Sequence, residues 1–288
     1  MDFDATSNSG PISDSTSPFE ISWSHTCTGS DRLLVVGIGN IASETINSVT
    51  YNGVALTLIG TITNTSGQAS LWYLINPTAG TNTVLVTMAT SFTAGVGMAV
   101  SLTGVHQTSP LDASTTQNVN NANSITTSVT TIADNCWVVD VVQGSGVAFT
   151  LTVGSGQTER QNVSSAGGDY NGMSTIGPKT PAGSQSMSWN DGGGAGTPDW
   201  AHVVASFKPV TKAAGITGTI ISSVTETDIV NGGKTIIITL TDDTWVATGA
   251  TFDAQRANII QGLDSAQSEL TGWNNEVRDK EVVGAVIR

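Results

Sequence analysis

Hydrophobic and polar residues alternate along the stretch from residue 19 to residue 27. The odd positions hold Phe19, Ile21, Trp23, His25 and Cys27, and polar residues stand between them. A period of two predicts a half-buried strand, because successive side chains of a strand point to opposite faces of the sheet. We therefore expect His25 and Cys27 to face a core, as a histidine bonded to a neighbouring backbone group and an inert thiol, rather than to form a catalytic or metal site.

Similar strand patterns follow at short spacing, and none has a helical period. They lie at 32–38, 45–51, 54–63, 69–75, 82–88, 95–105, 124–132, 136–142, 149–154, 184–189 and 199–207. Residues 32–38 are apolar on both faces, which predicts a central strand. Asn52-Gly53 predicts a tight hairpin turn, since both residues tolerate positive φ.

The longest segments between these strands, 106–123 and 155–183, are rich in Gly, Ser, Asn and Asp. This composition predicts loops. Many short strands joined by turns are typical of an all-β fold. We expect residues 1–209 to form one antiparallel, jelly-roll-like β-sandwich.

A second, smaller unit is predicted at 210–288, after a linker at 208–215 in which a proline, two lysines and small residues follow the last strand. It opens with two predicted strands, at 216–230 and 234–241. A helix is predicted over 252–270, because apolar residues recur there at three- and four-residue steps. The apolar residues of this helix are Phe252, Ile259, Leu263, Ala266 and Leu270.

Composition narrows the class of partner. The chain of 288 residues is 38% hydrophobic and 11% charged, with a net charge of −13 and 10 basic residues that never cluster. Binding to nucleic-acid phosphates needs a basic stripe, so a nucleic-acid partner is not expected. No segment reaches the roughly twenty apolar residues of a membrane helix. The first residues lack the basic start and apolar stretch of an export signal.

The two cysteines are far apart in sequence. Cys27 and Cys136 either pair, which closes a long loop, or stay as two buried free thiols. Free thiols are the expected state of a protein made in a reducing cytoplasm.

Several segments of residues 3–209 match a known pattern. They are "SWSHTCTGSDRLLVVGI", "VTYNGVALT", "WYLINPTAGTNTVLVT", "GVHQTSPLDA", "CWVVDVV" and "DWAHVVASFKP". They resemble landmarks of a β-sandwich module common in large bacterial surface proteins and in phage and prophage virion proteins, with His106 in place of an expected aspartate. Residues 216–280 are similar to an Ig-like segment with an inserted helix that recurs in phage structural and tail-associated proteins. The resemblance implies a fold and a setting, and no catalytic residues.

The second unit is the predicted oligomerisation or docking region. Two or three strands and one helix make a thin core, so we expect the helix face to be covered by another chain. The residues expected at this contact are Phe252, Ile259, Leu263 and Leu270. Identical chains are expected to associate symmetrically. A trimer is preferred, because virion fibres and decorations often use a threefold.

Few residues suggest catalysis. No Gly-x-Ser-x-Gly elbow stands between a strand and a helix, and His25, His106 and His202 are too scattered to indicate a zinc site. His202 is expected to be a surface or cross-strand residue. Asp140 lies mid-strand, where we expect it to accept hydrogen bonds from a loop rather than to act on a sugar.

Two segments are candidates for ligand binding. Residues 190–200 either wrap a calcium ion through Asp191 and Asp199 or form a flexible glycine loop. Tyr170 and Trp189, if exposed in loops, either stack on the rings of a host-surface glycan or anchor the loops. No other cofactor is expected.

These observations predict a non-enzymatic structural protein of a phage virion: a decoration, fibre or tail-associated subunit, assembled in the host cytoplasm and exposed on the particle. A first alternative is a carbohydrate-binding adhesion module of a bacterial surface protein. A second alternative is a polysaccharide depolymerase.

Overall fold

The computed structural model describes residues 1–14, 16–41, 44–146, 148–165, 168–193, 196–210, 221–229 and 233–240. The chain divides into two compact units, Met1–Thr211 and Lys212–Arg288. All regular elements within the described residues are strands. In the second unit, β18 (Ile221–Ile229) and β19 (Gly233–Leu240) form an antiparallel pair. The helix predicted at 252–270 lies outside the described residues.

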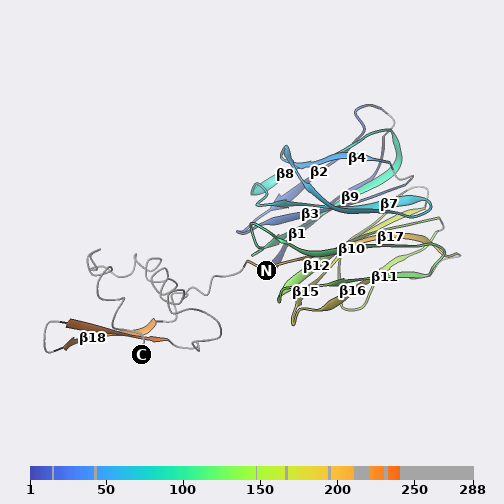
Figure 1. Cartoon of the computed structure of the whole chain (residues 1–288). Helices are drawn as coiled ribbons and strands as arrows, with labels where there is room; N and C mark the ends of the chain where they lie inside the picture. Colours follow the sequence, from blue (N-terminus) through green and yellow to red (C-terminus); the bar gives the residue numbers. More distant parts are fainter. Residues whose placement is uncertain are drawn as a thin grey trace. The chain divides into compact units, whose positions relative to one another are not determined.

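The first unit contains four antiparallel sheets, named A to D here, which form two sandwich-like bodies (Figure 1). The first body consists of sheets A and B. Sheet A has the spatial order β1 (Asp2–Asp14), β9 (Phe92–Thr103), β3 (Leu33–Ile41), β7 (Gly67–Ile75) and β6 (Thr57–Thr63). Sheet B has the order β2 (Glu20–Cys27), β8 (Gly80–Met88), β4 (Ile46–Tyr51) and β5 (Val54–Ala55).

The second body consists of sheets C and D. Sheet C has the order β10 (Leu111–Val119), β17 (Asp199–Phe207), β12 (Cys136–Ser145), β15 (Asp169–Lys179) and β14 (Thr158–Ser165). Sheet D has the order β11 (Ser124–Thr130), β16 (Ser184–Asp191) and β13 (Leu151–Val153). The all-β prediction is therefore confirmed, while the prediction of one sandwich over residues 1–209 is wrong: there are two.

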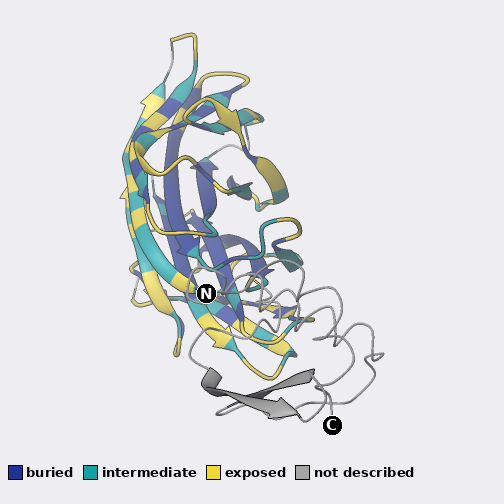
Figure 2. Ribbon diagram, turned by 90° about the vertical axis from the view of Figure 1, so that its left-hand side faces the viewer, coloured by how far each residue is buried: buried dark blue, intermediate teal, exposed yellow. Residues whose placement is uncertain are grey.

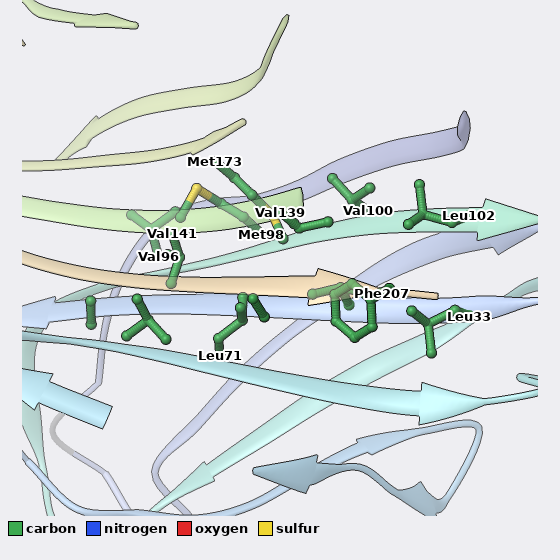
Figure 3. Close-up of a cluster of buried hydrophobic side chains, with 14 of the residues drawn as sticks. Leu33, Leu71, Val96, Met98, Val100, Leu102, Val139, Val141, Met173 and Phe207 are labelled. Atoms are coloured by element: carbon green, nitrogen blue, oxygen red, sulfur yellow. The ribbon is translucent and has the colours of Figure 1, made fainter. Parts of the chain in front are cut away.

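The four sheets stack in the order B, A, C, D, and a hydrophobic layer lies between each neighbouring pair. One layer, with Val36 and Tyr51, joins sheets A and B. The largest joins sheets A and C, where side chains of β3, β7 and β9 meet Val139, Val141 and Phe207 (Figure 3). Two smaller clusters join sheets C and D. Sheets A and C are thus covered on both faces.

This stacking explains the apolar runs of the sequence. Residues of β3 are buried at every position except the last, so the predicted central strand is confirmed. Strand β2 instead alternates between buried and more exposed positions, because sheet B is covered on one face only. Figure 2 shows the same contrast between fully buried inner strands and strands with exposed residues. The predicted hairpin turn is also confirmed, with φ of 50° at Asn52 and 76° at Gly53.

The segments predicted as loops hold much of the second body. Strand β10 lies within 106–123, and β14 and β15 lie within 155–183. Strand β15 resembles a loop in the sequence because most of its buried positions, all except Met173, carry small or polar residues. A Cβ atom on Gly172, for example, would lie 2.6 Å from the ring of Trp189. Gly and Ser here make room for the neighbouring sheet rather than forming turns.

The two bodies have the same strand order. Sheet A reads β1-β9-β3-β7-β6 and sheet C reads β10-β17-β12-β15-β14, so the strands correspond one to one. Sheet B reads β2-β8-β4 where sheet D reads β11-β16-β13. The residue two positions before β3, Asp31, has φ of 50°, and Asn135, directly before β12, has φ of 60°. The first unit therefore repeats one fold.

Candidate functional site

A group of polar side chains lies inside the second body, between sheets C and D. Asp140 of β12 and His202 of β17 are both fully buried. The Nε2 atom of His202 is 3.0 Å from Oδ2 of Asp140. On the other side of the ring, Nδ1 is 2.9 Å from Oγ1 of Thr127, which β11 supplies from sheet D. A line of threonine, histidine and aspartate therefore crosses from one sheet to the other.

The Asp140 carboxylate is surrounded by further donors. Its Oδ1 accepts hydrogen bonds from the backbone nitrogen of Ser174, at 2.7 Å, and from its hydroxyl, at 2.8 Å. Its Oδ2 also accepts a hydrogen bond of 2.9 Å from the indole of Trp189. The loop residue Gln157 approaches Oδ2 at 3.4 Å. Asp140 does accept hydrogen bonds, as expected, but most of its donors come from strands and only one from a loop.

Thr127, His202 and Asp140 follow the order of a nucleophile, a base and an orienting acid. Their burial in the folded protein excludes that catalytic role for these three residues. Thr127 is 2% exposed, and His202 and Asp140 are not exposed at all. A nucleophile must reach a substrate, and these atoms are packed between two sheets. A buried polar network whose members are satisfied instead fixes the packing of the surrounding strands. The cluster therefore acts as a polar crosslink within the second body.

A second polar contact lies inside the first body. His25 is buried, as predicted, but its partner is a side chain: its Nδ1 is 2.8 Å from Oγ of Ser7. That hydroxyl accepts a hydrogen bond of 3.0 Å from the indole of Trp23, so its own proton is free to point at Nδ1. Burial lowers the pKa of His25 to about 4, although the nearby Asp4 carboxylate raises it in part. His25 is therefore neutral at neutral pH.

Both cysteines are inert in this setting. Cys27 and Cys136 are buried, free, and located in different bodies. Burial raises the pKa of Cys27, and it raises the pKa of Cys136 to about 12. A thiolate is the reactive form of cysteine, so neither group has the character of a nucleophile.

Burial within the second body decides between alternatives that the sequence left open for two residues. Trp189 is not an exposed loop residue: it lies on the inner face of β16, fully buried against Gly172 and bonded to Asp140. Of the two alternatives for His202, the cross-strand position is confirmed, since the ring contacts Asp140 on the neighbouring strand β12, and the surface position is wrong, since sheet C is covered on both faces. Tyr170 is half-buried on β15, with its ring 4.1 Å from that of Phe149.

The carboxylates proposed for calcium serve the backbone of their loops. Oδ1 of Asp191 accepts a hydrogen bond from the backbone nitrogen of Gly193, and Oδ1 of Asp199 accepts one from that of Asn121, both at 2.9 Å. In the part of the chain that the structure describes, no group of three or more His, Cys, Asp or Glu side chains is placed to hold a metal ion. Residues 194–195 of this loop lie outside that part.

The predicted contact residues of the second unit, Phe252, Ile259, Leu263 and Leu270, also lie outside the described residues, so their role stays a prediction. Within the described part of the chain, no helix is long and apolar enough to cross a membrane.

Comparison of the chain with protein family models, with curated proteins and with solved structures finds no match.

Proposed function

We propose that this chain is a non-enzymatic structural protein of a phage virion, a decoration, fibre or tail-associated subunit with its sandwich bodies displayed on the particle. The observation that carries the proposal is the position of the reactive side chains. His25, His202, Asp140 and both cysteines are buried and used as packing and hydrogen-bonding groups. What remains at the described surface is mainly Thr, Ser, Asn and Gly, which suits a shell or fibre in contact with the medium.

The strand order supports the finer assignment of each body as a jelly roll. In the first body, β1-β9-β3-β7 faces β2-β8-β4-β5. A double sheet with this order is the arrangement of the jelly roll, which occurs in viral capsid and lectin domains. The second body repeats it with a shorter sheet D. The sequence resemblance to phage and bacterial-surface β-sandwich modules points in the same direction.

The direct test is whether the protein is present in purified virions. Virions from a host that carries the phage are purified on a density gradient, and their proteins are identified by mass spectrometry. The proposal expects this chain in stoichiometric amount in intact particles and accessible to antibody on their surface. Its absence from particles, together with its presence on the bacterial cell surface, would instead support the adhesion module.

Tyr170 favours glycan binding as a second candidate function. Its half-buried ring rests on Phe149, which holds it in a fixed position at the surface, and a fixed aromatic ring is the usual platform for a sugar. A glycan array probed with the full chain and with Tyr170→Ala tests this candidate. Binding that the variant loses would support it, while equal binding or none would refute it. Release of reducing ends from host capsule would support the depolymerase.

A further inference from the structure

The contact between the two bodies has the geometry of a symmetric dimer interface. We infer that the first unit is a covalent dimer of one repeated fold, in which the faces that sheets A and C turn towards each other are two versions of a self-complementary docking surface. The partner that fits each face is another copy of the same β-sandwich. This inference does not depend on the proposed function.

The strand contacts between sheets A and C are reciprocal. Strand β1 packs beside β14, and β6 packs beside β10. Since β10 corresponds to β1 and β14 to β6, these are the same contact made in both directions. The pairs β7 with β17 and β15 with β9 are related in the same way, and β3 packs on its own counterpart β12. In a twofold interface, if element i contacts j, then j contacts i.

The two edges of this interface carry their own polar contacts. On one edge, Nε2 of Gln161 donates to Oγ1 of Thr6 at 2.7 Å, and the guanidinium of Arg160 lies 3.7 Å from the ring centre of Phe3. On the other edge, Nδ2 of Asn118 donates to the carbonyl oxygen of Thr63 at 2.8 Å. Both reciprocal edges are thus bonded and not merely adjacent.

At the centre of the interface a position meets its own counterpart. Gly37 is the sixth residue after Asp31, and Val141 is the sixth after Asn135, the two residues with positive φ that precede β3 and β12. A Cβ atom on Gly37 would lie 2.8 Å from Cγ2 of Val141 and 2.9 Å from its Cβ. Two valines would not fit where a position faces itself, and here the first body has glycine where the second has valine.

Towards one end of the interface, a small residue of the first body again faces a large residue of the second body. Gly39 in the first body corresponds to Gln143 in the second by the same count of residues. A side chain on Gly39 would collide with Asn171, and one on Gly67 would collide with Gln143. The first body therefore contributes small residues, and the second body fills the space with amides. Nδ2 of Asn64 donates a hydrogen bond of 2.7 Å to Oε1 of Gln143 across this contact.

A residue swap at the centre tests the symmetry. Gly37→Val, Val141→Gly and the double variant are made in the full chain, and thermal unfolding is followed by tryptophan fluorescence. Each single variant should lower the melting temperature, through a collision or a cavity. The double variant should recover most of the loss, because a symmetric site accepts the valine from either side.

The matched control pairs Gly37→Val with Val139→Gly. This variant removes the same volume from the same face of the same strand, but at a position that does not face Gly37. It should show no recovery. If Gly37→Val with Val141→Gly melts no higher than the less stable single variant, or if the control recovers equally, the symmetric interface is refuted.

A nicked chain tests whether the interface holds without the connection. The exposed residues Thr108 and Ser109 lie in the connector between the bodies. A protease recognition sequence is inserted between them in the full chain and then cleaved. The two fragments should stay together as a 1:1 complex in native mass spectrometry and elute with the uncut protein. Separation of the fragments at micromolar concentration would overturn the inference.

Discussion

Acidification should destabilise the first body through His25. The ring is 1% exposed and is held neutral, since burial lowers its pKa from 6.5 to about 4. In the unfolded chain the same imidazole takes up a proton below its ordinary pKa. The unfolded state therefore binds more protons than the folded state between these two values, and stability falls as the pH falls through this window.

The size of the effect follows from the two pKa values. Each tenfold change in proton affinity is worth about 1.4 kcal/mol, so the drop from 6.5 to about 4 corresponds to a total loss of about 3 kcal/mol. Most of this, about 2 to 3 kcal/mol, should be lost already at pH 4.5. The pKa of Asp4 is lowered from 3.8, so that carboxylate stays ionised at pH 4.5 and adds little to the loss.

The assay is urea unfolding at pH 7.5 and pH 4.5 for the parent chain and for His25→Leu. The quantity compared is the difference in unfolding free energy between the two pH values within each variant, so any packing cost of leucine cancels. The leucine variant should lose about 2 to 3 kcal/mol less on acidification than the parent. His106→Gln, in the connector, should behave like the parent. An unchanged acid response in His25→Leu would show that burial of neutral His25 is not the cause.

Three further outcomes follow from buried groups and from the division into units. His202→Leu should cost about 3 kcal/mol or more in urea unfolding, because it leaves the buried Asp140 carboxylate without one of its donors, and the double variant with Asp140→Leu should cost still more, because the buried indole of Trp189 and the backbone nitrogen of Ser174 then lose their acceptor. Cys27 and Cys136 should resist a thiol reagent at pH 8 in the folded protein and react fully in urea, as read by absorbance; rapid reaction of the folded protein would contradict their burial. Deleting residues 212–288 should leave a folded first unit that no longer oligomerises in light scattering, and undiminished assembly would refute the docking role of the second unit.

The sequence was most informative where a strand has a simple environment. The alternation that includes Ile21 and Trp23 marks a strand covered on one face, and the apolar run of 32–38 marks a strand covered on both. The number of bodies could not be read in this way. The strands within 155–183 bury glycine, serine and amide side chains against large residues of other strands, and no local pattern separates such a strand from a loop.

The polar crosslink was also missed, although it left a signal. Asp140 interrupts the apolar run of 136–142 and His202 that of 200–205, and a polar side chain within such a run needs a buried partner. The two residues are 62 positions apart. Only the pairing of β12 with β17 brings them together, and the sequence alone does not reveal that pairing.

The repeat was hidden for a related reason: the two bodies build the same layer from different residues. Gly97 stands opposite Ile38, and His202 stands opposite Val142, each pair at the same step after the residue of positive φ. In the first body the ring of Trp23, from sheet B, occupies the space above Gly97.

In the second body the large side chain of this layer belongs to sheet C, the counterpart of sheet A, and not to sheet D. The ring of His202 extends from sheet C and meets the short side chain of Thr127 in sheet D. Because a histidine brings polar atoms as well as volume, this choice requires partners, which Asp140 and Thr127 supply. In each layer one sheet carries the large residue and the facing sheet leaves room for it, while the sheet that carries the large residue differs between the two bodies. The strand order can therefore persist after most side chains have been exchanged, and a comparison of residues position by position finds little in common between the two halves.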